Sequence, residues 1–274
     1  MGSTELRVPD RSSGPAAARH DVISIDLNAD LGEGFGRYRL PSDADLLSLV
    51  SSANIACGFH AGDPIVIRET VSRAVANRVV LGAHPSYPDR VGFGRRELAA
   101  TPDEIEADVI YQIGALAAFA TGHGARVRYV KPHGALYNRA AVDQTAARAI
   151  ARAIRTVDPE LVLLGLDGTV MIDEARAEGL EVAREAFVDR AYRPDGQLVS
   201  RSEPGAVLDD VATVVERAFR MVTERYVIAI DGTRRIVRPD SLCVHGDGPH
   251  AVAMVRALRE RFEGAGINIA SFTR

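Results

Sequence analysis

The sequence predicts an α/β fold in which strands and helices alternate about seven times, and it favours a barrel over an open sheet. Apolar runs of strand length alternate with helical segments, which is typical of a parallel α/β protein. Many of these runs end in His, Asp, Lys or Glu beside Gly or Pro. Periodicity alone does not separate a barrel from a doubly wound sheet. The even spread of the reactive strand ends favours the barrel, because an open sheet would concentrate them at one switch point.

The composition is that of a globular protein without a nucleic-acid or membrane signature. The 274 residues are 46% hydrophobic, enough for one large core or two smaller domains, and the net charge is −4. No basic stripe predicts a nucleic-acid partner, and no apolar run approaches the roughly 18 residues of a membrane helix. Two cysteines without a CxxC spacing exclude a thiolate zinc site. We interpret residues 1–20 as a flexible extension and 21–274 as a single catalytic barrel domain, and we expect a cytoplasmic protein.

The first predicted strand, residues 22–30, has an unusual polar face. A period of two puts Asp26, Asn28 and Asp30 on one face and apolar residues on the other. An edge strand with one solvated face is one interpretation. Parallel strands are usually apolar on both faces, so we favour a polar face that points into a site. The Gly-rich segment 31–36 matches neither GxGxxG nor a P-loop, and we interpret it as a ligand-lining loop that offers Glu33.

The stretch 54–64 is predicted to build one wall of the site. Small and apolar residues lead into His60 and Asp63, and Pro64 suits the first position of a helix that runs to about residue 77. The next strand, 78–85, ends in His84. The loop at 86–96 is long and rich in Gly, Asp and Arg. Loops of this length are usually functional or mobile, although a solvated surface loop is the alternative.

The remaining elements continue the same alternation. They are a helix from Pro102 to near 122, a strand at 126–133 with Tyr129, Lys131 and His133 on one face, a helix to about 156, a strand at 161–167, a helix to about 178, a strand at 180–189 that carries Glu185, a helix from about 204 to 223, a hairpin at 226–237, a strand at 241–247, a helix to about 262 and a small strand at 267–270.

Four of the seven histidines end predicted strands: His60, His84, His133 and His245. Any one of them is explained by a structural role, but four together favour a site. With Asp26 or Asp30 they would make a reasonable divalent-metal site. No HxH or HExxH spacing supports one, so a metal stays open, with Asp26, His60 and His133 as candidate ligands.

Two further side chains have a reactive and a structural interpretation. Cys57 lies among small residues and is either a nucleophile or, as we favour, a packed free thiol. Lys131 is a candidate contact for an anion or a developing charge, and its alternative is a lysine that extends from a strand rim to water.

Six motifs, in this order, resemble the LamB/YcsF family. They are DLNADLGE at 26–33, NIACGFHAGD at 54–63, AHPSYPD at 83–89 with GFGRR at 92–96, VKPHGALYN at 130–138, DRAY at 189–192 and CVHGD at 243–247. The resemblance spans roughly residues 22–272. One departure is Ser200, where the family pattern has Pro. The resemblance implies a distorted β/α barrel similar to the glycoside hydrolase/deacetylase superfamily.

The resemblance also implies an activity, which is the ATP-dependent hydrolytic opening of 5-oxoproline (pyroglutamate) to L-glutamate. In that family the A subunit works with the B and C subunits of a 5-oxoprolinase. ATP is then a co-substrate, although the absence of a P-loop leaves its binding place open. Two rival interpretations remain. One is a stand-alone metal-dependent deacetylase or amidohydrolase, and the other is a non-catalytic subunit that binds substrate for its partners.

The predicted site residues fall into two groups. The catalytic group is Asp30, Glu33, His60, His84, Lys131, His133 and Glu185. The group for substrate or phosphate binding is Asp26, Asn28, Asn54, Asp63, Asp89, Arg95, Arg96, Tyr137, Arg190, His245 and Asp247. In this hypothesis Lys131 and one arginine of the pair Arg95 and Arg96 contact anionic groups. One of three carboxylates (Asp30, Glu33 or Glu185) is the base for water, and the histidines orient groups or transfer protons.

Overall fold

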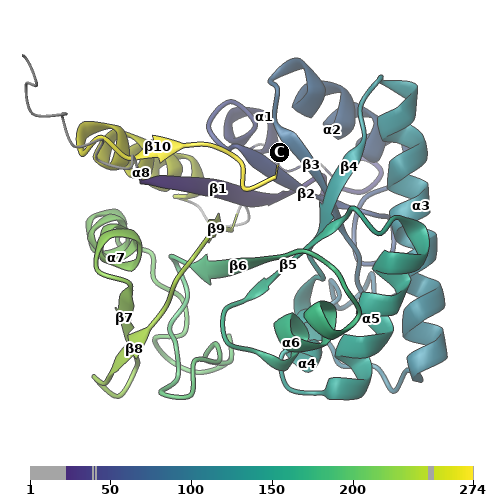
Figure 1. Cartoon of the computed structure of the whole chain (residues 1–274). Coiled ribbons are helices and arrows are strands. Elements are labelled where there is room, and N and C mark those ends of the chain that lie inside the picture. Colours follow the sequence, from purple (N-terminus) through teal and green to yellow (C-terminus); the bar gives the residue numbers. More distant parts are fainter. Residues whose placement is uncertain (1–22, 39, 41, 246–249, 274) are drawn as a thin grey trace, which may run out of the picture.

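Seven parallel strands form the centre of the molecule, a computed structural model that describes residues 23–38, 40, 42–245 and 250–273. The strands are β1 (Ser24–Leu31), β2 (Ser52–Ala56), β3 (Val80–His84), β4 (Val127–Val130), β5 (Val162–Leu166), β6 (Val182–Phe187) and β9 (Ser241–Val244). They pair in this order, and β9 also pairs with β1, which closes the ring (Figure 1). The predicted (β/α) barrel of about seven strands is therefore confirmed.

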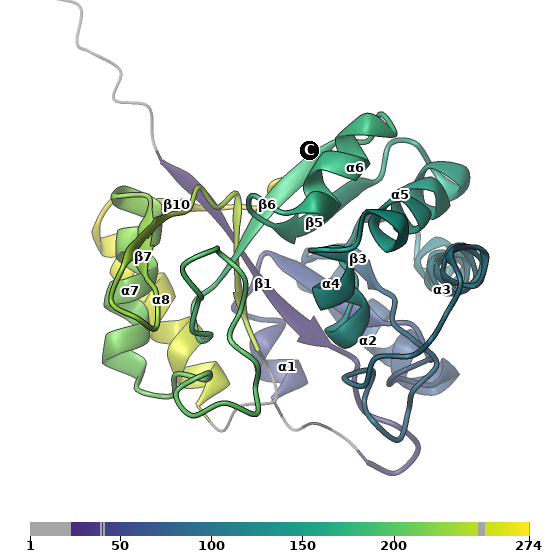
Figure 2. The same cartoon turned by 90° about the horizontal axis from the view of Figure 1, so that it is seen from below.

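Helices surround the outside of this barrel. They are α1 (Asp43–Leu46), α2 (Pro64–Ala76), α3 (Pro102–Gly122), α4 (Gly134–Ala140), α5 (Gln144–Val157), α6 (Val170–Ala177), α7 (Val211–Thr223) and α8 (Ala251–Gly264). Figure 2 shows α7 and α8 on the side of the barrel opposite α3. The helix α5 packs between α3 and α6 through a face of small alanines, which lets the helices approach closely.

Three short strands lie outside the ring. The strands β7 (Tyr226–Ile228) and β8 (Arg234–Ile236) form the predicted antiparallel hairpin. The strand β10 (Asn268–Ile269) pairs with the start of β1, beside which it lies in Figure 1, and it confirms the small strand predicted at 267–270. None of the helices in the described part of the chain is long and apolar enough to cross a membrane.

The first strand of the barrel is paired along both of its edges. Its middle pairs with β9 and its end with β2, so β1 is not an edge strand. The side chains of Asp26, Asn28 and Asp30 are all buried, and their partners come from other strands of the barrel. The polar face therefore points into the barrel and not to solvent.

Two helices differ from their predicted extents. The helix predicted at 134–156 is two helices, because Asp143 accepts hydrogen bonds from the N–H groups of Thr145 and Ala146 and so starts α5 afresh. The helix predicted to begin at about 204 begins at Val211, where Asp210 caps it through the N–H of Thr213. The extension predicted at 1–20 lies outside the described residues.

Candidate active site

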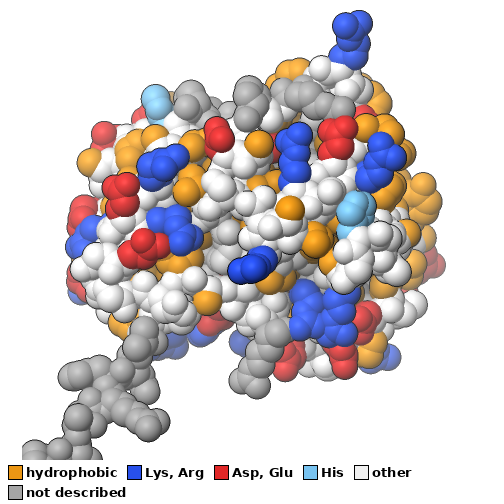
Figure 3. Space-filling view, turned by 90° about the horizontal axis from the view of Figure 1, so that it is seen from above, with side chains coloured by type: hydrophobic (Ala, Val, Ile, Leu, Met, Phe, Trp, Pro, Cys, Tyr) orange, Lys and Arg blue, Asp and Glu red, His pale blue; other side chains and the backbone are white. Residues whose placement is uncertain are grey.

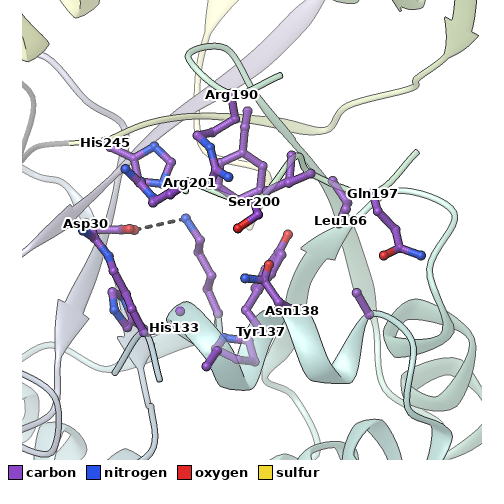
Figure 4. A pocket seen from close by; sticks show the side chains of 18 of the residues that line it. Asp30, His133, Tyr137, Asn138, Leu166, Arg190, Gln197, Ser200, Arg201 and His245 are labelled. Atoms are coloured by element: carbon purple, nitrogen blue, oxygen red, sulfur yellow. Dashed lines mark hydrogen bonds and ion pairs between the residues drawn. The ribbon is translucent and has the colours of Figure 1, made fainter. Parts of the chain in front are cut away.

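A cavity of about 380 Å³ lies at the carboxyl ends of the barrel strands. Its lining residues are Asp30, His84, Arg95, Lys131, Pro132, His133, Gly134, Ala135, Tyr137, Asn138, Ala141, Leu166, Phe187, Arg190, Arg193, Gln197, Leu198, Val199, Ser200, Arg201 and His245. They come from the ends of β1, β3, β5 and β6, from the residues just after β4 and β9, from the loops after β3 and β6, and from α4 and the residue that follows it. In Figure 4, Asp30, His133, His245 and Arg201 surround the same hollow.

The floor of the cavity is built around the buried side chain of Lys131. Its Nζ lies 3.0 Å from Oδ1 of Asp30 and 2.8 Å from Oε1 of Glu185, and the first of these ion pairs is the dashed line in Figure 4. Burial alone would lower the pKa of Lys131, but the two carboxylates raise it well above its usual value. The cavity therefore has a permanent ammonium group at its base.

Asp30 both pairs with Lys131 and lines the cavity. Burial alone would raise its pKa, but His84 and Lys131 hold that pKa well below the usual value. Its Oδ1 also accepts a hydrogen bond from the side chain of Asn54, whose own carbonyl accepts one from the hydroxyl of Tyr129. Asp30 is thus ionised and fixed in orientation by neighbours on three other strands.

Three of the four strand-end histidines meet beside Asp30. Nε2 of His84 lies 2.9 Å from Nδ1 of His133, and the rings of His60 and His133 stack with centroids 3.9 Å apart. The Oε1 atom of Glu33 lies 3.2 Å from Nε2 of His60 and 3.5 Å from Nδ1 of His133. Burial lowers the pKa of His60 and of His133 well below 6.5, so these two rings are neutral.

Glycine allows the loop at 86–96 to reach this histidine cluster. The N–H of Ala135 donates to the carbonyl of Gly94, and a Cβ on Gly134 would lie 2.4 Å from that same oxygen. Gly134 also has a φ of +59°, which favours glycine. The close contact brings the carbonyl of Phe93 to 2.9 Å from Nε2 of His133.

The fourth strand-end histidine, His245, lies in a separate group. Its Nδ1 is 2.9 Å from both oxygens of Asp189, and its ring stacks on Phe187. Burial alone would raise the pKa of Asp189, but the contact with His245 holds it below the usual value. His245 follows β9 and lines the cavity, and Asp189, which follows β6, holds its ring in place.

Four arginines give the cavity a cationic rim: Arg95, Arg190, Arg193 and Arg201. Arg190 is buried and donates to the carbonyls of Val199 and Ala206, which ties the loop after β6 together. Burial lowers the pKa of Arg190 to about 10, so the group stays charged near neutral pH. Together with Lys131, these groups make the cavity suited to an anion.

Several predicted site residues lie elsewhere. Asp63 caps α2 by accepting from the N–H groups of Ile65 and Val66. Asp89 pairs with Arg96 and accepts from the N–H of Gly92 within the loop. Neither carboxylate is part of the cavity lining. The predicted residue Asp247 lies outside the described residues.

The deeper polar residues of β1 support the site from below. Asp26, a predicted metal candidate, accepts hydrogen bonds from Ser51, Ser52 and Ser241 and belongs to neither group of potential metal ligands in the described residues. Burial raises its pKa to about 6. Asn28 contacts Nζ of Lys131. Both residues therefore shape the barrel interior beneath the cavity.

Sequence reasoning did not assign a site role to Asp189, Cys243, Asn138 or Arg201. Cys243 lies 3.1 Å from Nζ of Lys131, Asp189 holds His245, and the other two line the cavity. One signal was available in the composition. Lys131 is the chain's single lysine among 33 basic residues, and a lone lysine that ends a strand marks a special position. Cys57 is a buried thiol whose pKa burial raises to about 12, as expected of a packed residue.

The model of the LamB/YcsF family matches residues 25–274. A relative from Agrobacterium fabrum, named as a 5-oxoprolinase A subunit, is 56% identical over 251 residues, which cover 92% of this chain and 98% of the relative. Another from Mycobacterium avium, also named as the A subunit of a 5-oxoprolinase, is 54% identical, covering 92% of this chain and 100% of the relative.

A solved structure agrees with these relatives. The lactam utilization protein from Thermus thermophilus superposes with a TM-score of 0.87 at 50% identity, covering 91% of this chain and 100% of that one. The polysaccharide deacetylase Bc1974 from Bacillus cereus reaches a TM-score of only 0.45 at 11% identity, a distant likeness that carries no functional argument. The chain therefore belongs to the LamB/YcsF family.

Proposed function

We propose that this chain opens the lactam ring of 5-oxoproline to give L-glutamate, as the A subunit of an ATP-dependent 5-oxoprolinase. The names of its relatives support a role in 5-oxoproline metabolism. The observation that carries the proposal is the buried ammonium of Lys131 at the base of a cavity rimmed by arginines. Such a cavity suits a small ligand that is an anion and that develops further negative charge as it reacts.

The reaction needs an activated lactam, because an amide has a poor leaving group. ATP transfers its γ-phosphoryl group to the lactam oxygen and departs as ADP. A water oxygen then adds to the lactam carbon as a base removes its proton. The C–N bond breaks, the nitrogen takes up a proton, and an acyl phosphate of glutamate forms. A second water attacks the acyl carbon and releases inorganic phosphate, which leaves glutamate.

The cationic residues are assigned to the anionic groups of this substrate. Arg190 and Arg201 lie on the loop after β6 and bind the carboxylate of the ring or the phosphoryl group. Lys131 stabilises the negative charge that develops on the oxygens at the reacting carbon. Both assignments follow from the fixed positions of these groups around one cavity, where fixed charges need no reorganisation during the reaction.

Asp30 is assigned as the base that receives the proton of the attacking water. It is the carboxylate at the cavity floor, it is ionised, and its second oxygen lies 3.4 Å from Nε2 of His84. Glu185 is placed differently, because it is fully buried beneath Lys131 and accepts from the hydroxyl of Tyr137. We assign Glu185 to the positioning of the ammonium group. Glu33, which contacts His60 and His133, belongs to the adjoining histidine cluster.

We also propose that the B and C subunits take part in the reaction, and that ATP binds within the complex that they form with this chain. The chemistry separates phosphorylation of the lactam from ring opening, so the two steps can occupy different subunits. The rival interpretation of a subunit that only binds substrate makes a different prediction. It expects turnover to survive the loss of Lys131 as long as the complex still forms.

Reconstitution tests the proposal. The purified chain is mixed with the B and C subunits of a 5-oxoprolinase, 5-oxoproline and ATP, and glutamate and phosphate are measured. The proposal expects equal amounts of both products, released only when ATP and all three subunits are present. If a mixture that lacks this chain released as much glutamate as the complete mixture, the proposal would be contradicted.

A further inference from the structure

The imidazole rings of His84 and His133 meet nitrogen to nitrogen, at a distance that requires a proton or another cation between the two atoms. Nδ1 of His84 lies 2.7 Å from the carbonyl of Lys131, and Nε2 of His133 lies 2.9 Å from the carbonyl of Phe93. A carbonyl only accepts, so each of these outer ring nitrogens carries the hydrogen. The inner nitrogens lie 2.9 Å apart and are joined either by a proton carried on one of them or by a metal ion that both of them bind.

The neighbours of this gap are also lone-pair donors. Oε1 of Glu33 lies 3.5 Å from Nδ1 of His133 and 3.2 Å from Nε2 of His60. One ligand atom from each of the four residues (Glu33, His60, His84 and His133) lies within 4.8 Å of the other three. We infer that these four side chains form a binding site for a divalent transition-metal ion, next to the floor of the cavity.

The distances among Glu33, His84 and His133 suit coordination to one ion, whereas the ring of His60, which stacks parallel on His133, has to turn before its Nε2 points at the same ion. Ligand atoms about 2.1 Å from an ion lie roughly 3.0 Å apart at right angles and roughly 3.4 Å apart at the tetrahedral angle. The observed separations of 2.9, 3.2 and 3.5 Å fall around these two values. The outer hydrogen bonds of His84 and His133 to backbone carbonyls are also the arrangement that fixes the tautomer and the ring orientation of a metal-binding histidine.

The donor set selects the class of ion. Imidazole nitrogens suit Zn²⁺, Fe²⁺, Co²⁺ and Ni²⁺, whereas Mg²⁺ and Ca²⁺ take oxygen ligands. The second group of potential ligands, formed by Asp30, Cys243 and His245, is a poorer candidate because Asp30 and Cys243 already contact the ammonium of Lys131.

Metal uptake tests the site without reference to turnover, so the result stands apart from the ring-opening proposal. The full chain is treated with chelator, dialysed and titrated with Co²⁺, whose visible absorption reports nitrogen ligands. Zn²⁺ is then added in competition, and the metal content is measured. We expect about one ion per chain and a melting temperature that rises with the Zn²⁺ concentration.

The variants are chosen to keep the outer hydrogen bonds. His84→Asn retains a donor in the place of Nδ1, and His133→Gln retains one in the place of Nε2, while each loses its inner nitrogen. Both are expected to lose the Co²⁺ absorption and the thermal shift. The exposed residue His250 provides the matched control, since His250→Asn removes an imidazole that stands at the N-cap position of α8 without a side-chain capping hydrogen bond and belongs to neither group of potential metal ligands among the described residues.

Two results would overturn the inference. One is a wild-type chain that takes up no Co²⁺ and shows no thermal shift with Zn²⁺, in which case a shared proton joins the two imidazoles. The other is uptake that is the same in wild type, His84→Asn and His133→Gln, which would place the ion elsewhere. Absence of uptake by the wild type is decisive by itself, so this arm of the test does not depend on the folding of any variant.

Discussion

Replacing Lys131 by methionine is expected to destabilise the barrel strongly, because it leaves two buried carboxylates without their counter-ion. Asp30 is 6% exposed and Glu185 is fully buried, and both contact the same Nζ. Methionine keeps nearly the same volume, so packing changes little. Removing one partner of a buried ion pair costs about 3–5 kcal/mol. We expect a loss of this size in the free energy of unfolding near pH 8.

The loss should shrink as the pH falls. In the wild type the pKa of Asp30 is depressed, so its contribution is fully present above the unfolded value and is lost only in acid. In Lys131→Met, burial is opposed by His84 but no longer by the ammonium group, so the pKa of Asp30 in the folded state rises above its wild-type value. Stability is then recovered below that raised pKa, and the penalty should be smaller near pH 5 than near pH 8.

Urea unfolding followed by far-ultraviolet circular dichroism measures these values, since the chain has no tryptophan to report by fluorescence. The double variant Lys131→Met/Glu185→Gln removes one of the two stranded charges, and it should recover a large part of the loss. The reasoning would be refuted if Lys131→Met lowered the free energy of unfolding by less than about 1 kcal/mol, and by the same amount at both pH values, because a buried charge without a counter-ion costs more than this.

Three further changes test other parts of the fold. Burial raises the pKa of Asp26 to about 6, so this group should lower the free energy of unfolding by roughly 2 kcal/mol as the pH rises from about 4 to 7; Asp26→Asn should remove that contribution, as measured in thermal melts. A Cβ on Gly82 would lie 2.1 Å from the ring of Tyr129, so Gly82→Ala should cost about 1–3 kcal/mol or more. The control Gly114→Ala, with open space in α3, should gain roughly 0.5–1 kcal/mol; equal effects would contradict this contrast. Cys57, whose pKa burial raises to about 12, should resist a thiol reagent at pH 8 until urea is added, and fast reaction in the native state would speak against its burial.

Local sequence patterns predicted which polar side chains lie at or just after the ends of strands, but not which of these side chains contact one another. The alternation in β1 correctly placed Asp30 in the barrel interior, and β3 ends at His84 as predicted. The strand predicted at 126–133 ends earlier, at Val130, and His133 lies at the N-cap position of α4. Which carboxylate pairs with Lys131 depends on the register across several strands. That register is set by the closure of β9 on β1, a contact between residues as far apart in the sequence as Asp26 and Ser241.

Two aspartates that were predicted as site residues, Asp63 and Asp89, have local structural roles instead. Asp63 and Asp89 both lie beside glycine or proline after a strand, as a catalytic group would. The same position suits an aspartate that satisfies local backbone N–H groups, and the structure uses Asp63 as a helix cap and Asp89 within a loop. The reverse error occurred in the loop after β6, where Arg201 lines the cavity. Only the three-dimensional path of that loop reveals the contact.

Charged side chains of both signs are distributed over the surface of the molecule (Figure 3). Positive and negative side chains are interspersed over the face seen in Figure 3, without a continuous basic patch on that face. The net charge of the whole chain is −4.

Turnover by the three-subunit complex with and without Lys131 tests the central claim most directly. Glutamate release is measured for wild type, Lys131→Met and Lys131→Met/Glu185→Gln, each assembled with the B and C subunits. The surface variant Arg126→Gln, which loses only an exposed ion pair with Glu160, is the control. The account predicts that both Lys131 variants lose about 10²–10³-fold in kcat while the complex still forms. Wild-type turnover by the folded double variant would contradict it.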